Sequence, residues 1–244
     1  MKDSSRIYIA TSGFYYDHWK GPFYPEGLPK SKFLQFYIGR FNSVELNNPF
    51  YRLPNEAAVR HWYDIAPGGF IYAVKASRVI THIKRLKDAK PSLELLFERI
   101  APLKEKLGPI LFQLPPNWKI NTERLEEFLK ALPKGGRHAF EFRDTSWFEP
   151  EVYELLREHN AGFCIYDFNF VQSPKEITAD FIYLRLHGPA GPYSGSYSDE
   201  ALRGWAADFR KWIKKVKNIY CYFDNDQAGF AALNALALKK IIEG

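Results

Sequence analysis

The sequence predicts a single (β/α)8 barrel of the TIM type, and three observations lead to this fold class. Short apolar or alternating runs recur roughly every 30 residues, which is the length of one βα unit. Amphipathic helical patterns separate these runs. The 244 residues also match the size of one such barrel. We therefore expect one domain over residues 1–244. A doubly wound open sheet is the alternative, but no GxGxxG motif follows the first strand.

Eight runs are expected to form the strands. Their apolar residues alternate with polar ones or follow one another without a break, as is typical of strands in a parallel sheet. The eight runs are Ile7–Gly13, Ser43–Asn47, Phe70–Lys75, Ile110–Leu114, Ala139–Arg143, Phe163–Asp167, Phe181–His187 and Ile219–Asp224.

The helices are predicted from apolar residues three and four positions apart and from the residues that precede them. Asn55, Ser198 and either Asn121 or Thr122 are expected N-caps, and Pro150 suits a first helical position. Three further helices are expected at Phe33–Arg40, at Leu93–Leu107 with a kink at Pro102, and at Ala228–Ile242.

The segment Ser173–Asp180 is too short for a full helix. We therefore expect the sixth crossover of the barrel to be degenerate.

Composition excludes several classes of protein. Aromatic residues make up 17% of the chain, which argues against disorder, and no apolar run reaches the roughly 18 residues that span a bilayer. The N-terminus, from Met1 to Arg6, has no apolar stretch of the secretory type, so we expect a cytoplasmic protein. Cys164 and Cys221 are far apart and are expected to be buried free thiols. No zinc-type spacing occurs, and we expect neither a metal nor a cofactor.

The predicted strands end in polar residues, and the site of a TIM barrel lies at these carboxyl ends. Residues two apart on a strand point the same way, which places Glu141 with Arg143 and Arg185 with His187. Five of these polar residues are candidate catalytic groups because they can transfer a proton or stabilise charge: Glu45, Lys75, Glu141, His187 and Asp224. An ionic plug that only fills the barrel is the structural alternative.

A second set of residues is expected to bind the ligand. Aromatic side chains in the loops can stack on bases or sugars, and basic or amide groups can hold phosphate. The candidates are Trp19, Asn47, Tyr51, His82, Gln113, Arg143, Trp147, Asp167, Arg185, Tyr193 and Tyr197.

Two loops next to these residues have unusual compositions. The loop Arg78–Lys90 carries five basic residues and one acid, which suits phosphate, although a solvated loop is equally consistent. The glycine-rich segment Gly188–Tyr197 is expected to be a mobile lid. The basic run Lys211–Lys217 is expected to be a solvated helix face.

Several motifs, in order along the chain, resemble the YecE-like family, domain of unknown function 72. They are TSGFYYDHWKGPFYP, VELNNPFYRLP, YAVKASRVITH, LFQLPPNW, FEFRDTSW, LRLHGPAGPYSGSYSDE and YFDNDQAGFAALNA. The resemblance implies a TIM-type barrel and no established activity. This sequence departs from the family pattern at Phe14, where Trp is more usual, and at Ala10, where Gly is more usual.

The resemblance points to residues that largely coincide with the strand-end set. They are Trp19, Glu45, Asn47, Tyr51, Lys75, His82, Gln113, Glu141, Arg143, Trp147, His187, Tyr193, Tyr197 and Asp224.

Three functions are consistent with this sequence. The first is binding or hydrolysis of a phosphate-containing ligand such as nucleic acid, in which case an enzyme would be a hydrolase of the phosphodiesterase or nuclease type. A multi-metal nuclease site is not expected because the six histidines are scattered. The second is a glycoside hydrolase or sugar-modifying enzyme that uses Glu45, Glu141 and Asp224. The third is a binding protein without catalysis.

Overall fold

The computed structural model describes residues 6–244. The expected absence of a secretory signal concerns residues 1–5, which lie outside this range. Eight parallel strands alternate with helices along the chain, and in the sheet they neighbour one another in the order β1-β9-β8-β6-β5-β4-β3-β2; this confirms the predicted TIM-type barrel. A ninth short strand, β7, pairs antiparallel with β6.

The contacts divide the chain into two compact units. Unit 1 comprises the chain up to Glu45, Ile165–Lys175 and Asp180–Gly244, and unit 2 comprises Leu46–Cys164 and Glu176–Ala179. Each is described separately below, and the single domain expected from the sequence remains a prediction.

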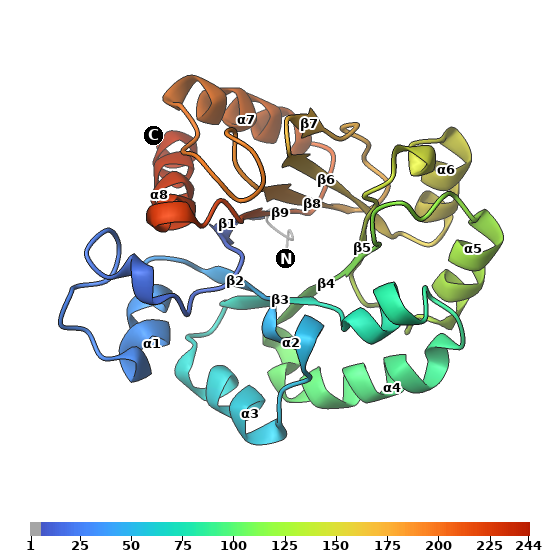
Figure 1. Cartoon of the computed structure of the whole chain (residues 1–244), viewed down its shortest axis with the longest axis horizontal. Helices are drawn as coiled ribbons and strands as arrows, with labels where there is room; N and C mark the ends of the chain where they lie inside the picture. The colour runs from blue at the N-terminus through green and yellow to red at the C-terminus, as the bar shows by residue number, and fades with distance from the viewer. Residues whose placement is uncertain (1–5) are drawn as a thin grey trace. The chain divides into compact units, whose positions relative to one another are not determined.

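Unit 1 contains the strands at both ends of the sequence. Its β1 pairs in parallel with β9, and β9 pairs in parallel with β8. A bridge between Ser12 and Glu45 joins β2 to the end of β1. Helix α8 packs against β1 and β9, and α7 packs against α8 (Figure 1). The elements are β1 Arg6–Thr11, η1 Asp17–Trp19, η2 Lys30–Lys32, α1 Phe33–Ile38, most of β2 Ser43–Leu46, the second half of β6 Gly162–Phe168, β7 Val171–Gln172, β8 Phe181–Leu186, α7 Asp199–Trp212, β9 Asn218–Phe223, η6 Gln227–Gly229 and α8 Phe230–Glu243.

Unit 2 contains the middle of the chain. Strand β4 pairs in parallel with β3 and β5, and β5 pairs with the first residues of β6. The elements are α2 Asn48–Tyr51, α3 Glu56–Ile65, β3 Ile71–Lys75, the π-helical turn η3 Val79–Ile83, α4 Ala89–Ile100, η4 Ala101–Lys106, β4 Leu107–Gln113, α5 Thr122–Ala131, β5 His138–Glu141, η5 Thr145–Trp147 and α6 Pro150–Glu158.

The helices with predicted N-caps begin where the sequence places them, whereas α4 begins at Ala89 instead of Leu93 and α8 at Phe230 instead of Ala228. Asn55 accepts a hydrogen bond from the Ala58 amide at 2.8 Å, and Ser198 caps α7 in the same way. Asn121 rather than Thr122 caps α5. Because an N-cap side chain satisfies an otherwise unpaired amide, each of these helices has a fixed first turn.

Two irregular segments also agree with expectation. The α4 helix ends at Ile100, and a 3-10 segment containing Pro102 follows it. This break is the predicted kink, since proline cannot donate the helical hydrogen bond. Between β6 and β8 the described chain forms the short strand β7 and no helix, so the sixth crossover is degenerate. No helix in residues 6–244 is long and apolar enough to cross a membrane.

Candidate functional site

A buried charged network in unit 1 is centred on Arg185. The alternation of β8 points Tyr183 and Arg185 to the same side. The Arg185 guanidinium donates from Nη2 to Glu45 Oε1 at 2.8 Å and from Nε to Glu45 Oε2 at 3.1 Å. Arg185 is 1% exposed and Glu45 is 0% exposed. This two-pronged pairing compensates two charges that would otherwise be costly to bury.

Glu45 has further partners that limit its chemistry. The hydroxyls of Tyr183 and Ser12 donate to its two carboxylate oxygens. An ionised carboxylate has about four acceptor positions. Four donors therefore saturate Glu45, and this weighs against its expected role as a catalytic acid or nucleophile in sugar chemistry. Ser12 and Tyr183 were not singled out from the sequence, although Tyr183 lies two residues before Arg185 on the same strand face.

Asp224 and His187 complete this network. Arg185 Nη2 also donates to Asp224 Oδ2 at 2.9 Å, and His187 Nδ1 lies 3.0 Å from the same oxygen. His187 Nε2 lies 3.3 Å from Arg185 Nη1. Since arginine only donates hydrogen bonds, Nε2 must accept, which makes His187 neutral with its proton on Nδ1. Glu45, Asp224 and Arg185 then carry a net charge of −1, which does not favour phosphate.

Aromatic rings surround His187 in the same unit. Its ring meets Phe168 edge-on at 5.2 Å and Tyr193 at 5.5 Å. Tyr193 is 46% exposed, as a ligand-stacking ring requires. Tyr197 is buried and donates to Asp167 Oδ2 at 3.1 Å. Burial raises the pKa of Asp167, and the bond from Tyr197 partly offsets that rise. Tyr197 and Asp167 therefore bind each other in this structure.

The loop Gly188–Tyr197, which its composition predicts to be a mobile lid, is closed by several hydrogen bonds in this structure. The Gly188 amide donates to Tyr197 Oη at 3.0 Å, and Asn225 Nδ2 donates to the Gly195 carbonyl at 2.8 Å. Gly188 has a φ of 113°, and a Cβ there would lie 2.1 Å from the Ser194 carbonyl oxygen. The glycine thus permits a tight closure of the loop.

Trp19 is not the exposed stacking ring that the sequence predicts. It is 0% exposed, and its indole N–H donates to Asp226 Oδ1. His18 Nε2 lies 3.1 Å from the other carboxylate oxygen. Burial raises the pKa of Asp226 to about 6, against the opposing effects of Trp19 and His18. Asp226 was missed because it lies beyond the predicted strand end, where the alternation rule no longer applies.

Unit 2 has its own group of polar residues at the ends of β3, β4 and β5. In the sheet register, Lys75 pairs with Leu111, and Gln113 pairs with Glu141. Arg143 follows β5 by two residues and forms an ion pair with Glu141 through its Nε. The Glu141 side chain is 0% exposed and that of Arg143 is 6% exposed. Glu141 is thus a buried, charge-compensated carboxylate.

Lys75 and His82 lie around Phe50 in this group. The Lys75 ammonium is 4.3 Å from the centre of the Phe50 ring, and the His82 ring meets Phe50 edge-on at 5.1 Å. Burial lowers the pKa of His82, the charges of Lys75 and Arg78 lower it further, and Glu141 opposes them. With His82 neutral, Lys75, Arg143 and Glu141 carry a net charge of +1. This group of three charged side chains therefore has the positive excess that attracts an anion.

Gln113 and Asn47 are the two amide residues that the sequence predicts at the strand ends. Gln113 ends β4, and within the described residues no hydrogen bond reaches its buried Oε1 atom. Leaving a buried acceptor unpaired costs about 1–3 kcal/mol, so a ligand that donates a hydrogen bond to it would gain affinity. Asn47 is half-buried and directly precedes α2.

The aromatic candidate residues of unit 2 differ in solvent exposure. Trp147 is 0% exposed and donates to the Trp118 carbonyl at 2.6 Å, so it packs inside the fold instead of facing a ligand. Tyr51 is 73% exposed. Tyr51 is therefore the available stacking ring among the predicted residues of this unit.

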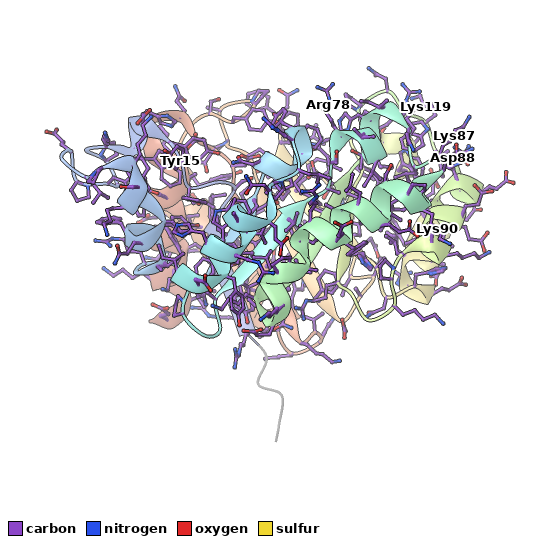
Figure 2. The ribbon with its side chains drawn as sticks, turned by 90° about the horizontal axis from the view of Figure 1, so that it is seen from below. Tyr15, Arg78, Lys87, Asp88, Lys90 and Lys119 are labelled. Atoms are coloured by element: carbon purple, nitrogen blue, oxygen red, sulfur yellow. The ribbon has the colours of Figure 1, made fainter. Side chains whose placement is uncertain are left out.

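The basic loop expected at residues 78–90 contains η3 and an irregular turn. Arg85 and Asp88 have positive φ angles there. Figure 2 shows Arg78, Lys87 and Lys90 on the surface of unit 2, where their side chains extend away from the ribbon. These charges add to the positive potential of the unit, although solvent screens exposed charges.

No group of three or more His, Cys, Asp or Glu side chains suited to a metal ion occurs within residues 6–244. Cys164 and Cys221 are buried and unbonded to each other, as predicted.

Comparisons with known proteins concern almost the whole chain. The family model described as "Protein of unknown function DUF72" matches residues 8–244. The Bacillus subtilis protein YunF, described as a UPF0759 protein, is 25% identical over 270 residues, which cover 97% of this chain and 95% of that protein.

Two solved structures agree with the fold. A DUF72 family protein from Thermotoga maritima is 34% identical, with a TM-score of 0.89 over 98% of this chain and 100% of that chain. A DUF72 family protein from Enterococcus faecalis is 19% identical, with a TM-score of 0.85 over 98% and 96% of the two chains, and at that identity it supports the fold alone.

Proposed function

We propose that this chain, which belongs to the DUF72 family of proteins of unknown function, binds a phosphate-containing ligand at the ends of β3, β4 and β5 in unit 2. Single-stranded nucleic acid is the first ligand to test. The observation that carries the proposal is the excess of positive charge around Lys75, with a neutral His82 beside it.

Each of the contributing residues has a separate task in this proposal. The half-buried Lys75 ammonium, which lies over the face of Phe50, supplies positive charge to the phosphate. Gln113 Oε1 accepts a hydrogen bond from a hydroxyl or amino group of the ligand. Arg143 contributes positive charge while it keeps Glu141 compensated.

The network of unit 1 has a different task. Its charges pair mutually, and Glu45 and His187 are fully buried. These contacts support the ionic plug considered from the sequence, with Asp224 as its partly exposed edge.

The test is the binding of a fluorescent oligothymidine across a salt series. Lys75→Met removes the charge and keeps an unbranched side chain of similar length beside Phe50, so the fold should be retained. We expect severalfold weaker binding at low salt and a shallower dependence on salt by about 0.7 in the logarithmic slope, which corresponds to one lost phosphate contact. The matched control is Lys214→Met, on the exposed surface after α7.

Two outcomes would contradict the proposal. One is the absence of salt-dependent binding in the wild type. The other is an equal loss of oligonucleotide affinity in Lys75→Met and Lys214→Met, which would indicate nonspecific contacts on the basic surface.

The same samples separate binding from hydrolysis. Burial lowers the pKa of His82, and its Nδ1 lies 2.8 Å from Thr81 Oγ1; in the tautomer whose Nδ1–H donates to that hydroxyl, Nε2 is the proton acceptor that a hydrolytic step would use. If the oligonucleotide is cleaved, His82→Gln should stop cleavage and retain binding.

A further inference from the structure

A groove on unit 2, formed by α2, α3, η3 and α4, has the composition of a second ligand site. Its volume is about 890 Å³, which is in the range of small-molecule sites. In Figure 1, α2, α3 and α4 lie on the same part of unit 2. None of the strand-end residues Lys75, Gln113, Glu141 or Arg143 lines it.

The groove has two cationic side chains and no acidic lining residue. Arg52 and Arg99 both line it. Within residues 6–244 no ion pair joins either arginine to a carboxylate, and the Arg99 Nε atom is buried without a hydrogen-bond partner. A buried guanidinium N–H that lacks an acceptor is costly, and an anion in the groove would provide one.

The remaining walls are aromatic and apolar. Tyr51 is 73% exposed, Val79 40% and Leu95 43%, and the half-buried Trp62 also lines the groove. Large exposed side chains gathered beside unpaired arginines indicate a ligand that has both a flat apolar part and a negative charge.

We propose that this groove binds a nucleoside monophosphate. The two arginines match the charge of a phosphate monoester, which is about −1.5 to −2 at neutral pH. Tyr51 provides a face on which the base stacks, and Val79 and Leu95 cover the other apolar edges. This site is independent of Lys75, so either proposal can fail while the other stands.

The experiment is calorimetric titration with 5′-AMP, adenosine and inorganic phosphate. We expect 5′-AMP to bind and adenosine to bind at least tenfold more weakly, because adenosine lacks the phosphate that accepts charged hydrogen bonds from the two arginines. Arg52→Met and Arg99→Met should each weaken 5′-AMP about tenfold or more. Tyr51→Ala should weaken 5′-AMP and leave the affinity for inorganic phosphate unchanged.

Two controls make the result specific. Arg60→Met changes an exposed arginine on α3 that pairs with Glu56 and does not line the groove. This variant should therefore bind 5′-AMP with the affinity of the wild type. Arg52 is exposed, so Arg52→Met retains the fold even if Arg99→Met does not. Lys75→Met should also bind 5′-AMP normally.

Three outcomes would overturn the assignment. The first is no binding of 5′-AMP at low salt. The second is an equal loss of affinity for 5′-AMP in Arg60→Met and Arg52→Met. The third is a loss of affinity in Lys75→Met with normal binding in Arg52→Met, which would place 5′-AMP at the strand ends. An acidic hexapeptide that binds more tightly than 5′-AMP and loses affinity in the same variants would replace the nucleotide as the occupant.

Discussion

Replacing Arg185 by methionine tests whether the network of unit 1 stabilises the fold. The change removes the positive charge shared by Glu45 and Asp224 and leaves the alkyl part of the side chain in place. Glu45 is 0% exposed, so water cannot replace the guanidinium.

Breaking a buried ion pair in this way costs about 3–5 kcal/mol. For a chain of this size, each kcal/mol lowers the melting temperature by roughly 2–4 °C, so we expect Arg185→Met to melt about 6–20 °C below the wild type.

The assay is thermal unfolding followed by circular dichroism, with Arg157→Met as the matched control. Arg157 also pairs with two carboxylates, those of Glu154 and Glu176, but its side chain is 38% exposed. An exposed pair contributes less than about 1 kcal/mol, so this control should melt within a few degrees of the wild type.

A second variant identifies the cause of the loss. In Glu45→Gln/Arg185→Met the uncompensated carboxylate is gone, and part of the lost stability should return. The reasoning is refuted if Arg185→Met loses no more stability than Arg157→Met.

Two further predictions concern pH. Burial lowers the pKa of His138 to about 4, so the wild type should lose stability as pH falls from about 6.5 toward 4. In urea unfolding, the free energy of unfolding of His138→Phe should fall less over this range than that of the wild type. An equal fall in both proteins would contradict the prediction. The pKa of Asp226 is raised to about 6, so its protonated form is favoured in the folded state and its contribution to stability falls as pH rises from about 4 through 6. Asp226→Asn should therefore gain stability over the wild type more at pH 7 than at pH 4.5 in urea titrations, and a constant difference would show that Asp226 does not titrate in this range.

The order of the elements follows from the sequence because local patterns determine it. All eight predicted strands occur, with ends that differ by up to three residues. The N-caps Asn55 and Ser198 and the break after Ile100 depend on neighbouring residues alone. The short segments α2 and β7 were not predicted, because four and two residues carry no periodic signal.

The sequence also located polar residues at the strand ends, since the alternation of a strand fixes the side to which each side chain points. It did not determine which charges meet. Glu45 pairs with Arg185, 140 positions away, while Glu141 pairs with Arg143 two residues along the chain. Such choices depend on distances between strands that only the folded chain sets.

Exposure was decided by the tertiary structure as well. Trp19, Trp147 and Tyr51 are all aromatic residues in loops next to strand ends, and the sequence gives no reason to separate them. The fold buries the two tryptophans, whose indole N–H groups find acceptors inside the protein, and leaves Tyr51 in solvent. Burial is a property of packing between segments distant in sequence, so it lies beyond what a local pattern determines.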